Sequence, residues 1–136
     1  MAPSQRFRMI VLAVPKEGLS QEEFSAYWTE KHAPLFMSIA ISKRNVLKYE
    51  QLHLDPKPTA LIDSATGWGA LAHHQLPKFG GVAILEAESP EKIAEIFQDE
   101  EYRRVVTPDE GMFCDRAGLY ILAGHYVTIF DRVDST

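Results

Sequence analysis

A helix-start signal followed by an aromatic stripe constrains the fold of this chain more than any other feature. Ser20 precedes Glu23 by three residues, the spacing of a capping box in which each side chain bonds a backbone N–H of the other residue. Phe24, Tyr27 and Trp28 follow at i, i+3 and i+4, so they share one face of a helix. The pattern therefore predicts an amphipathic helix that begins at Ser20 and turns its aromatic face toward an apolar surface.

His32 is the first candidate for chemistry. It lies one turn beyond Trp28 on the same helix face. Pro34 disfavours a helical conformation at Ala33, so we expect the helix to end near His32, where the macrodipole favours a protonated imidazole. A capping or packing role is the commoner use of a histidine in such a place.

Composition limits the classes of function. The chain has 136 residues, about one domain, and its net charge of -5 without a basic run argues against nucleic acid and against an anionic membrane surface. The single Cys114 excludes an intrachain disulfide framework, and the scattered histidines suggest no metal site. Neither a secretory signal nor a stretch long enough to span a membrane is visible, so we expect a soluble cytoplasmic protein.

Four apolar segments have the length and the branched residues of strands. They are residues 6–14, 46–54, 82–87 and part of 119–130. In the last segment Gly124 marks either a bulge or a boundary before the main strand, expected at residues 126–130. A second helix is expected to begin at Ser89 and Pro90 and to be broken by residues 107–111.

The strand at residues 46–54 places polar side chains in a row. Alternation puts Tyr49, Gln51 and His53 on one face, either as a functional surface or as the wetter face of a half-exposed strand. The long segment from residue 55 to residue 79 is expected to be irregular and to act as a lid. At most one of its adjacent histidines, His73 and His74, is expected to reach a site.

The order strand, helix, strand, strand, helix, strand predicts an α+β, ferredoxin-like βαββαβ fold with a four-stranded antiparallel sheet. Two helices would cover one face of this sheet. The other face needs a partner, and a second copy of the same sheet would supply it, so we expect a homodimer in the form of a dimeric α+β barrel.

At this point the sequence resembles EthD-domain proteins of the dimeric α+β-barrel superfamily. The residues that carry the resemblance are 8–12, 23–28 with 32–35, 48–53, 81–86 and 97–102. The resemblance implies a single domain over residues 1–136 with a lid-like loop at about 55–79. Several small fungal relatives are similar to decarboxylases or dehydratases of aromatic polyketide biosynthesis that use no metal and no organic cofactor.

The residues offer what such a lyase needs: an apolar slot, a proton-transfer group and a donor to an enolate oxygen. We expect His32, His53 and Tyr49 to be catalytic. We expect the aromatic or polyketide substrate to contact Phe24, Tyr27, Trp28, Phe36, Trp68, His73, Tyr102 and Asp109. A solvated turn is the commoner role for Asp109. The alternatives are a cofactor-independent monooxygenase or a polyketide cyclase on the same fold, and a non-catalytic small-molecule-binding accessory protein.

Overall fold

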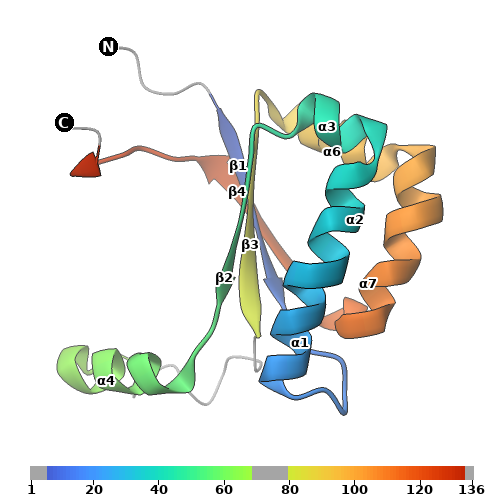
Figure 1. The fold of residues 1–136 in the computed structure, drawn as a ribbon. Coiled ribbons are helices and arrows are strands. Elements are labelled where there is room, and N and C mark those ends of the chain that lie inside the picture. Colours follow the sequence, from blue (N-terminus) through green and yellow to red (C-terminus); the bar gives the residue numbers. More distant parts are fainter. Residues whose placement is uncertain (1–5, 69–79, 134–136) are drawn as a thin grey trace.

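The computed structural model describes residues 6–68 and 80–133 and has a sheet with helices packed on one face (Figure 1). The sheet is antiparallel, with strand order β2-β3-β1-β4. Its strands are β1 (Phe7–Ala13), β2 (Lys48–His53), β3 (Gly81–Ala87) and β4 (Tyr120–His125). This arrangement confirms the predicted ferredoxin-like α+β fold.

The helical segments fall into a layer on the sheet and one arm away from it (Figure 1). The layer contains α1 (Gln21–Tyr27), the π-helical segment η1 (Trp28–His32), α2 (Ala33–Ser38), α3 (Ala40–Asn45), α6 (Pro90–Gln98), the π-helical segment η2 (Tyr102–Val106) and α7 (Thr107–Phe113). A short 3-10 turn, η3 (Arg116–Gly118), leads into β4. The arm is α4 (Pro56–Thr66).

Both predicted helix starts are confirmed. The Ser20 side chain accepts a hydrogen bond from the Glu23 N–H at 3.1 Å, and the Glu23 carboxylate accepts one from the Ser20 N–H at 3.0 Å. Ser89 caps α6 in the same manner, by accepting from the Lys92 N–H at 3.2 Å. These local bonds satisfy N–H groups that have no partner inside a helix.

The expected helix ends at Pro34 and at residues 107–111 are wrong, because a π turn precedes each proline. The Ala33 N–H bonds to the Trp28 carbonyl, and the Thr107 N–H bonds to the Tyr102 carbonyl, both five residues back. In an α-helix the proline ring would collide with the carbonyl four residues back, and the wider π turn relieves that contact. The helical conformation therefore continues past both prolines, and His32 is not at a helix C-terminus. The helix that begins at Ser89 and Pro90 is a separate element that ends at Gln98.

The hydrophobic core is divided into two clusters under the helix layer. One contains Met9, Phe36, Ile39, Ile41, Leu85, Ala87, Ile93, Ile96, Tyr102 and Val106. The other contains Ala13, Phe24, Trp28, Phe113 and Cys114. Residues of both clusters line one cavity. The candidate site therefore lies where the two clusters meet.

Residues 56–66 and 126–130 differ from the sequence-based expectation. Residues 56–66 form α4, whose N-cap Asp55 accepts from the Lys57 N–H, instead of an irregular loop. The fourth strand is Tyr120–His125 because its register with β1 runs only from Leu12 to Phe7. Gly124 pairs with Arg8 in unbroken register, without a bulge.

The sheet face opposite the helices carries exposed apolar side chains at one end and the charged residues Arg8 and Glu86 at the other. Leu52, Tyr120 and Leu122 on this face are more than half exposed. The arm α4 and the chain beyond β4 both project on this side of the sheet, away from the helix layer (Figure 1). In the described part of the chain, no helix has the length and apolar character needed to cross a membrane.

Candidate functional site

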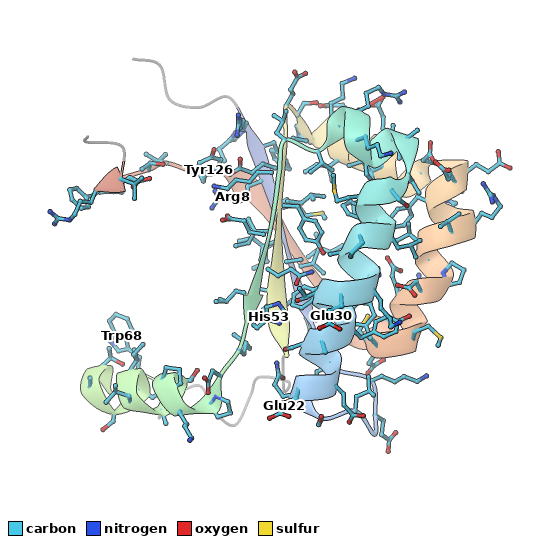
Figure 2. All side chains as sticks on the ribbon, in the orientation of Figure 1. Arg8, Glu22, Glu30, His53, Trp68 and Tyr126 are labelled. Atoms are coloured by element: carbon cyan, nitrogen blue, oxygen red, sulfur yellow. The ribbon has the colours of Figure 1, made fainter. Side chains whose placement is uncertain are left out.

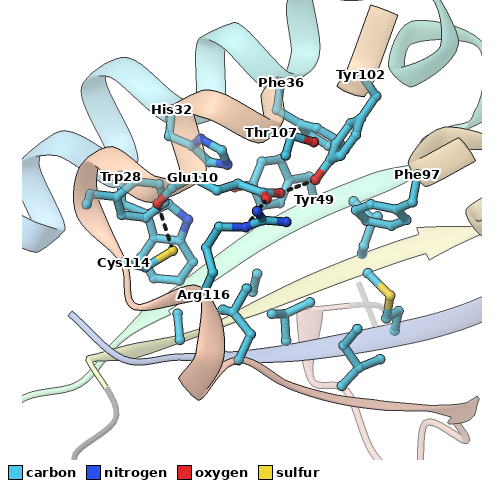
Figure 3. A pocket seen from close by; sticks show the side chains of 18 of the residues that line it. Trp28, His32, Phe36, Tyr49, Phe97, Tyr102, Thr107, Glu110, Cys114 and Arg116 are labelled. Atoms are coloured by element: carbon cyan, nitrogen blue, oxygen red, sulfur yellow. Dashed lines mark hydrogen bonds and ion pairs between the residues drawn. The ribbon is translucent and has the colours of Figure 1, made fainter. Parts of the chain in front are cut away.

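A cavity of about 640 Å³ lies between the helix layer and the sheet (Figure 3). Its walls are largely apolar and aromatic. Trp28 comes from η1, Phe36 from α2, Phe97 from α6 and Phe113 from α7. A small set of polar groups interrupts these walls: His32, Tyr49, Tyr102, Arg103, Thr107, Glu110 and Arg116. An apolar cavity with a few convergent polar groups is the usual form of a small-molecule site.

The side chain of His32, in η1, is held by a carboxylate from α7. Its Nδ1 lies 2.9 Å from Oδ2 of Asp109, and the Tyr27 hydroxyl donates to Oδ1 of Asp109 at 2.5 Å. Both side chains of the His32–Asp109 pair are largely buried, with 11% and 15% of their surface exposed. Because Asp109 accepts the Nδ1 proton, the Nε2 atom of His32 is left for the cavity.

The hydrogen bond to Asp109 also fixes the protonation state of the Tyr27 phenol. It raises the pKa of the Tyr27 phenol to about 12, with smaller contributions from burial and from the charge of Asp109. Tyr27 therefore stays protonated and orients Asp109. It does not line the cavity in the described structure, and its proton is not directed there.

Tyr49 lines the cavity from β2. Its hydroxyl oxygen accepts a hydrogen bond from the Gln51 amide at 2.9 Å. Burial raises the pKa of the Tyr49 phenol, although hydrogen bonds from Gln51 and Trp28 oppose this shift. Tyr49 is therefore a neutral phenol whose O–H is available to donate.

Tyr102, Glu110 and Arg116 form a second polar group at the cavity wall (Figure 3). The Tyr102 hydroxyl donates to the Glu110 carboxylate, and Nε of Arg116 lies 3.3 Å from the same carboxylate. Burial, followed by the charge of Glu110, raises the pKa of Tyr102 well above its usual value. Tyr102 thus gives its hydrogen bond to Glu110, while Arg116 neutralises that carboxylate.

Cys114 lies against the same cavity but is not activated. Its Sγ donates to the Glu110 carbonyl oxygen at 3.0 Å. Burial, with a further contribution from the Glu110 charge, raises the pKa of the Cys114 thiol to about 12. Since the thiolate is the nucleophilic form, this cysteine is a packing group at neutral pH.

His53 lies behind the main cavity. It lines a smaller pocket of about 320 Å³ together with Thr29, Ala33, Tyr49 and Gln51. Its ring packs on the Trp28 indole with centroids 5.0 Å apart, and burial lowers the pKa of the imidazole. The histidine that the sequence placed beside Tyr49 is therefore near the site without lining its cavity.

The structure brings together about half of the predicted site residues. His32, Tyr49, Trp28, Phe36 and Tyr102 line the main cavity. Phe24, Tyr27 and Asp109 lie one layer behind it: Phe24 is fully buried against Trp28 and Phe113, and Asp109 holds His32. Asp109 is therefore not part of a solvated turn. Its carboxylate is largely buried and paired with His32.

Trp68 does not line the cavity in the described structure. Trp68 is 77% exposed at the end of the α4 arm (Figure 2). The arm lies on the opposite side of the sheet from the cavity, so α4 does not cover the cavity of its own chain (Figure 1). His73 and the rest of residues 69–79 lie outside the described residues.

Sequence reasoning missed Arg103, Thr107, Glu110 and Arg116 as cavity residues. The missed signal is helical spacing that continues through the prolines. Trp28, His32 and Phe36 recur at i, i+4 and i+8, and Tyr102 and Glu110 are eight residues apart. Within residues 6–68 and 80–133, no three His, Cys, Asp or Glu side chains converge as metal ligands.

The comparisons with known proteins place this architecture in a known family. The family model described as the EthD domain matches residues 16–117, about three quarters of the chain. No curated protein matches the chain.

Several solved structures share the fold. The chain is similar to an ethyl tert-butyl ether d (EthD) family protein from Bacillus halodurans C-125, with 14% identity, TM-score 0.57 and coverage of 90% of this chain and 99% of that one. It is also similar to a dimeric ferredoxin-like protein of unknown function from Bacteroides fragilis NCTC 9343, with 9% identity, TM-score 0.58 and coverage of 92% and 100%. An EthD-like protein from Ralstonia eutropha JMP134 has 12% identity, TM-score 0.53 and coverage of 95% and 96%.

Proposed function

Because this chain belongs to the EthD domain family, we propose that its cavity is the active site of a cofactor-free lyase. The substrate class is a flat aromatic, polyketide-like compound with a β-keto acid or a β-hydroxy ketone. The observation that carries the proposal is the His32–Asp109 hydrogen bond of 2.9 Å beside an apolar cavity. A carboxylate behind an imidazole fixes its tautomer and orients the other ring nitrogen for proton transfer.

In dehydration, His32 Nε2 removes the acidic proton next to the substrate carbonyl. The electron pair enters the carbonyl as an enolate, whose oxygen receives a hydrogen bond from Tyr49. The enolate then re-forms the carbonyl and expels the β-hydroxyl group, which leaves as water with the proton from His32. Each proton and each electron pair is accounted for by the substrate and these two side chains.

In decarboxylation, the same two residues act in a different order. The bond to the carboxylate breaks, carbon dioxide leaves, and the electron pair forms the same enolate under Tyr49. His32, protonated in this branch, then delivers a proton to the carbon that lost the carboxylate. General acid–base assistance of this kind is worth about 100- to 10,000-fold in rate.

Two guanidinium groups favour substrates with an anionic end. Arg103 lines the cavity, and no described residue pairs with it. Arg116 also lines the cavity and shares the single Glu110 carboxylate. Arg103 is therefore the cation at the cavity wall that would attract a carboxylate or a phenolate on the substrate.

The same proposal includes a homodimer. Leu52, Tyr120 and Leu122 form part of an apolar patch on the outer face of the sheet that the described part of the chain leaves exposed. The similar proteins from Bacteroides fragilis and from an uncultured marine organism are described as dimeric. Size-exclusion chromatography with light scattering should give the mass of two chains, and Leu122→Asp should give the mass of one.

The function is tested by incubating the purified, metal-stripped protein with a panel of aromatic β-keto acids and β-hydroxy ketones. Mass loss and oxygen uptake are followed together. Release of carbon dioxide or water without oxygen uptake is the expected result, and it should fall about 100- to 10,000-fold in His32→Gln. The matched control is His125→Gln, which changes a histidine outside the cavity and should keep full turnover.

Three outcomes would contradict the lyase. Oxygen consumption in step with product would indicate an oxygenase, and ring closure without mass loss would indicate a cyclase. Binding without any change in the ligand would indicate a non-catalytic carrier.

A further inference from the structure

Three alternate residues of β2 form a hydrogen-bonded series on the helix-facing side of the sheet. Nε2 of His53 lies 2.9 Å from Oε1 of Gln51, and Nε2 of Gln51 lies 2.9 Å from the Tyr49 hydroxyl oxygen. Tyr49 is the one member of this series that lines the main cavity. The series thus connects a half-buried histidine to the cavity through an amide.

The amide of Gln51 has a fixed orientation. Its Nε2 also lies 3.4 Å from the backbone carbonyl oxygen of Trp28, which can only accept a hydrogen bond. The NH2 group of Gln51 therefore faces Trp28 and Tyr49, and its oxygen faces His53. Thr29 adds a second donor to that oxygen, at 3.1 Å.

The tautomer of His53 follows from the same contacts. Because Gln51 presents an oxygen, His53 must present N–H at Nε2. The other ring nitrogen, Nδ1, is buried and has no partner in the described structure, so a proton there would be an unsatisfied donor. Burial lowers the pKa of His53, in agreement with a neutral ring.

All donors in this series therefore point toward Tyr49, and Tyr49 accepts. Tyr27 and Tyr102, the other two tyrosines predicted for the site, donate their hydrogen bonds to Asp109 and to Glu110. Only Tyr49 among these three has a hydroxyl proton that is not committed to a carboxylate. The Tyr49 hydroxyl is therefore the one of the three whose proton is available to a ligand in the cavity.

We propose that Gln51, held by His53, is a positioning residue that presents an N–H and no acceptor to the Tyr49 hydroxyl, so that the Tyr49 proton stays available to a carbonyl or enolate oxygen of the ligand. This inference rests on the proposed function for the identity of the site, since it names the ligand group that the site selects. It also reassigns His53: it is a positioning residue that acts through Gln51 instead of a group that touches substrate.

The variant Gln51→Glu tests the direction of the series, because it keeps the shape of the side chain but replaces the NH2 donor with an acceptor. Tyr49 should then donate to the introduced carboxylate and no longer to the ligand. Gln51→Met is the matched control, since it removes the amide without supplying a carboxylate. In that variant the Tyr49 proton stays available to the cavity.

Two probes of similar shape give a readout that does not depend on turnover. Acetonaphthone has a carbonyl acceptor and ethylnaphthalene has none, and tryptophan fluorescence reports the binding of both. The wild-type protein should bind the ketone up to about tenfold more tightly than the hydrocarbon, the value of one hydrogen bond. Tyr49→Phe and Gln51→Glu should bind both probes equally, and Gln51→Met should keep the preference within about twofold.

The double variant Tyr49→Phe/Gln51→Glu separates positioning from structure. If Gln51 acts through Tyr49, the double variant should bind both probes as Tyr49→Phe does. A ketone preference that survives in Gln51→Glu, or additive losses in the double variant, would overturn the proposal. If Gln51→Glu does not fold, the infrared carbonyl stretch of bound acetonaphthone decides: it should shift to lower frequency in the wild type and not in Tyr49→Phe, and equal frequencies would overturn the proposal.

Failure of the proposed function gives a different result. A protein that shows the ketone preference and its loss in Gln51→Glu, but turns over no substrate, keeps the positioning inference and loses the lyase. A protein that turns over substrate without any ketone preference keeps the lyase and loses the role of Gln51.

Discussion

The imidazole of His32 and the carboxylate of Asp109 are 77 positions apart in the sequence and lie 2.9 Å apart in the fold. Each residue comes from a helix that continues past a proline by way of a π turn. π-helical segments are rare and occur frequently at functional sites. The pair of π segments, on neighbouring helices, is thus what brings the imidazole of His32 and the carboxylate of Asp109 together beside the cavity.

The first prediction concerns this pair. Asp109→Asn should reduce kcat by about 100-fold or more, because an amide can donate to Nδ1 and stabilise the wrong tautomer of His32. KM should change little, since Asp109 does not line the cavity. Steady-state kinetics with the substrate identified from the panel measures both constants.

The control for Asp109→Asn is Glu100→Gln, an exposed carboxyl of the same helical region. It should leave kcat unchanged. A rise in KM without a fall in kcat for Asp109→Asn would contradict the role of Asp109 behind the base.

The second prediction uses two adjacent arginines as a matched pair. Arg103 lines the cavity and Arg104 does not, although both are exposed residues of η2. Arg103→Gln should weaken the binding of naphthoate by about three- to tenfold and leave the binding of its methyl ester unchanged, because only the acid carries a charge. Arg104→Gln should change neither affinity.

Titration of both probes at low and high salt measures the effect. The advantage of the acid over the ester should decrease as salt is added, since exposed charges are screened. Equal losses in the two arginine variants would contradict a specific subsite and indicate only a general effect of net charge.

The third prediction concerns the contact between β3 and Trp28. A Cβ atom at Gly81 would collide with the Trp28 ring and would lie 2.7 Å from the Leu52 carbonyl oxygen. Gly81→Ala should therefore destabilise the fold by about 1 to 3 kcal/mol, because the indole cannot move without disturbing its cluster. Thermal unfolding measures the loss, and Gly111→Ala is the control, since a Cβ there meets nothing within 4 Å.

The fourth prediction concerns the ion pairs of Glu86. This carboxylate is 1% exposed and accepts from Arg8 at 2.5 Å and from Arg6 at 3.2 Å. Arg8 in turn stacks on Tyr126, 3.9 Å from its ring centroid (Figure 2). Burial alone would raise the pKa of Glu86, but the two guanidinium groups hold it below its usual value.

A lowered pKa in the folded state means that the stabilisation is present above the ordinary glutamate pKa of 4.5 and is lost as the pH falls through the folded value. At neutral pH, Glu86→Gln should cost about 1 to 3 kcal/mol, the value of hydrogen bonds to a charged group. The difference in Tm between wild type and variant should shrink as the pH is lowered below 4.5. A difference that stays constant with pH would show that Glu86 acts through packing alone.

The local signals in the sequence were sufficient for the order of the sheet strands and for the starts of two helices. The capping box at Ser20, the Ser89-Pro90 helix start and the apolar strand runs each specify local structure through bonds between near neighbours. Together they predicted the order of elements and, from it, the ferredoxin-like sheet. They also predicted His32 and Tyr49 as residues of the site, because each lies on the inward face of its element.

Contacts between distant segments decided the rest. The local sterics of a proline predict that a helix ends before it. The sequence does not show that a π turn will accommodate the proline when the buried residues before and after it hold the helix against the core. The sequence by itself therefore determined the two capped helix starts, three of the strands and the candidate base. Only the tertiary structure decided that Asp109 orients His32 and that Gln51 accepts from His53 and donates to Tyr49, because hydrogen-bond direction depends on which groups packing brings within about 3 Å of each other.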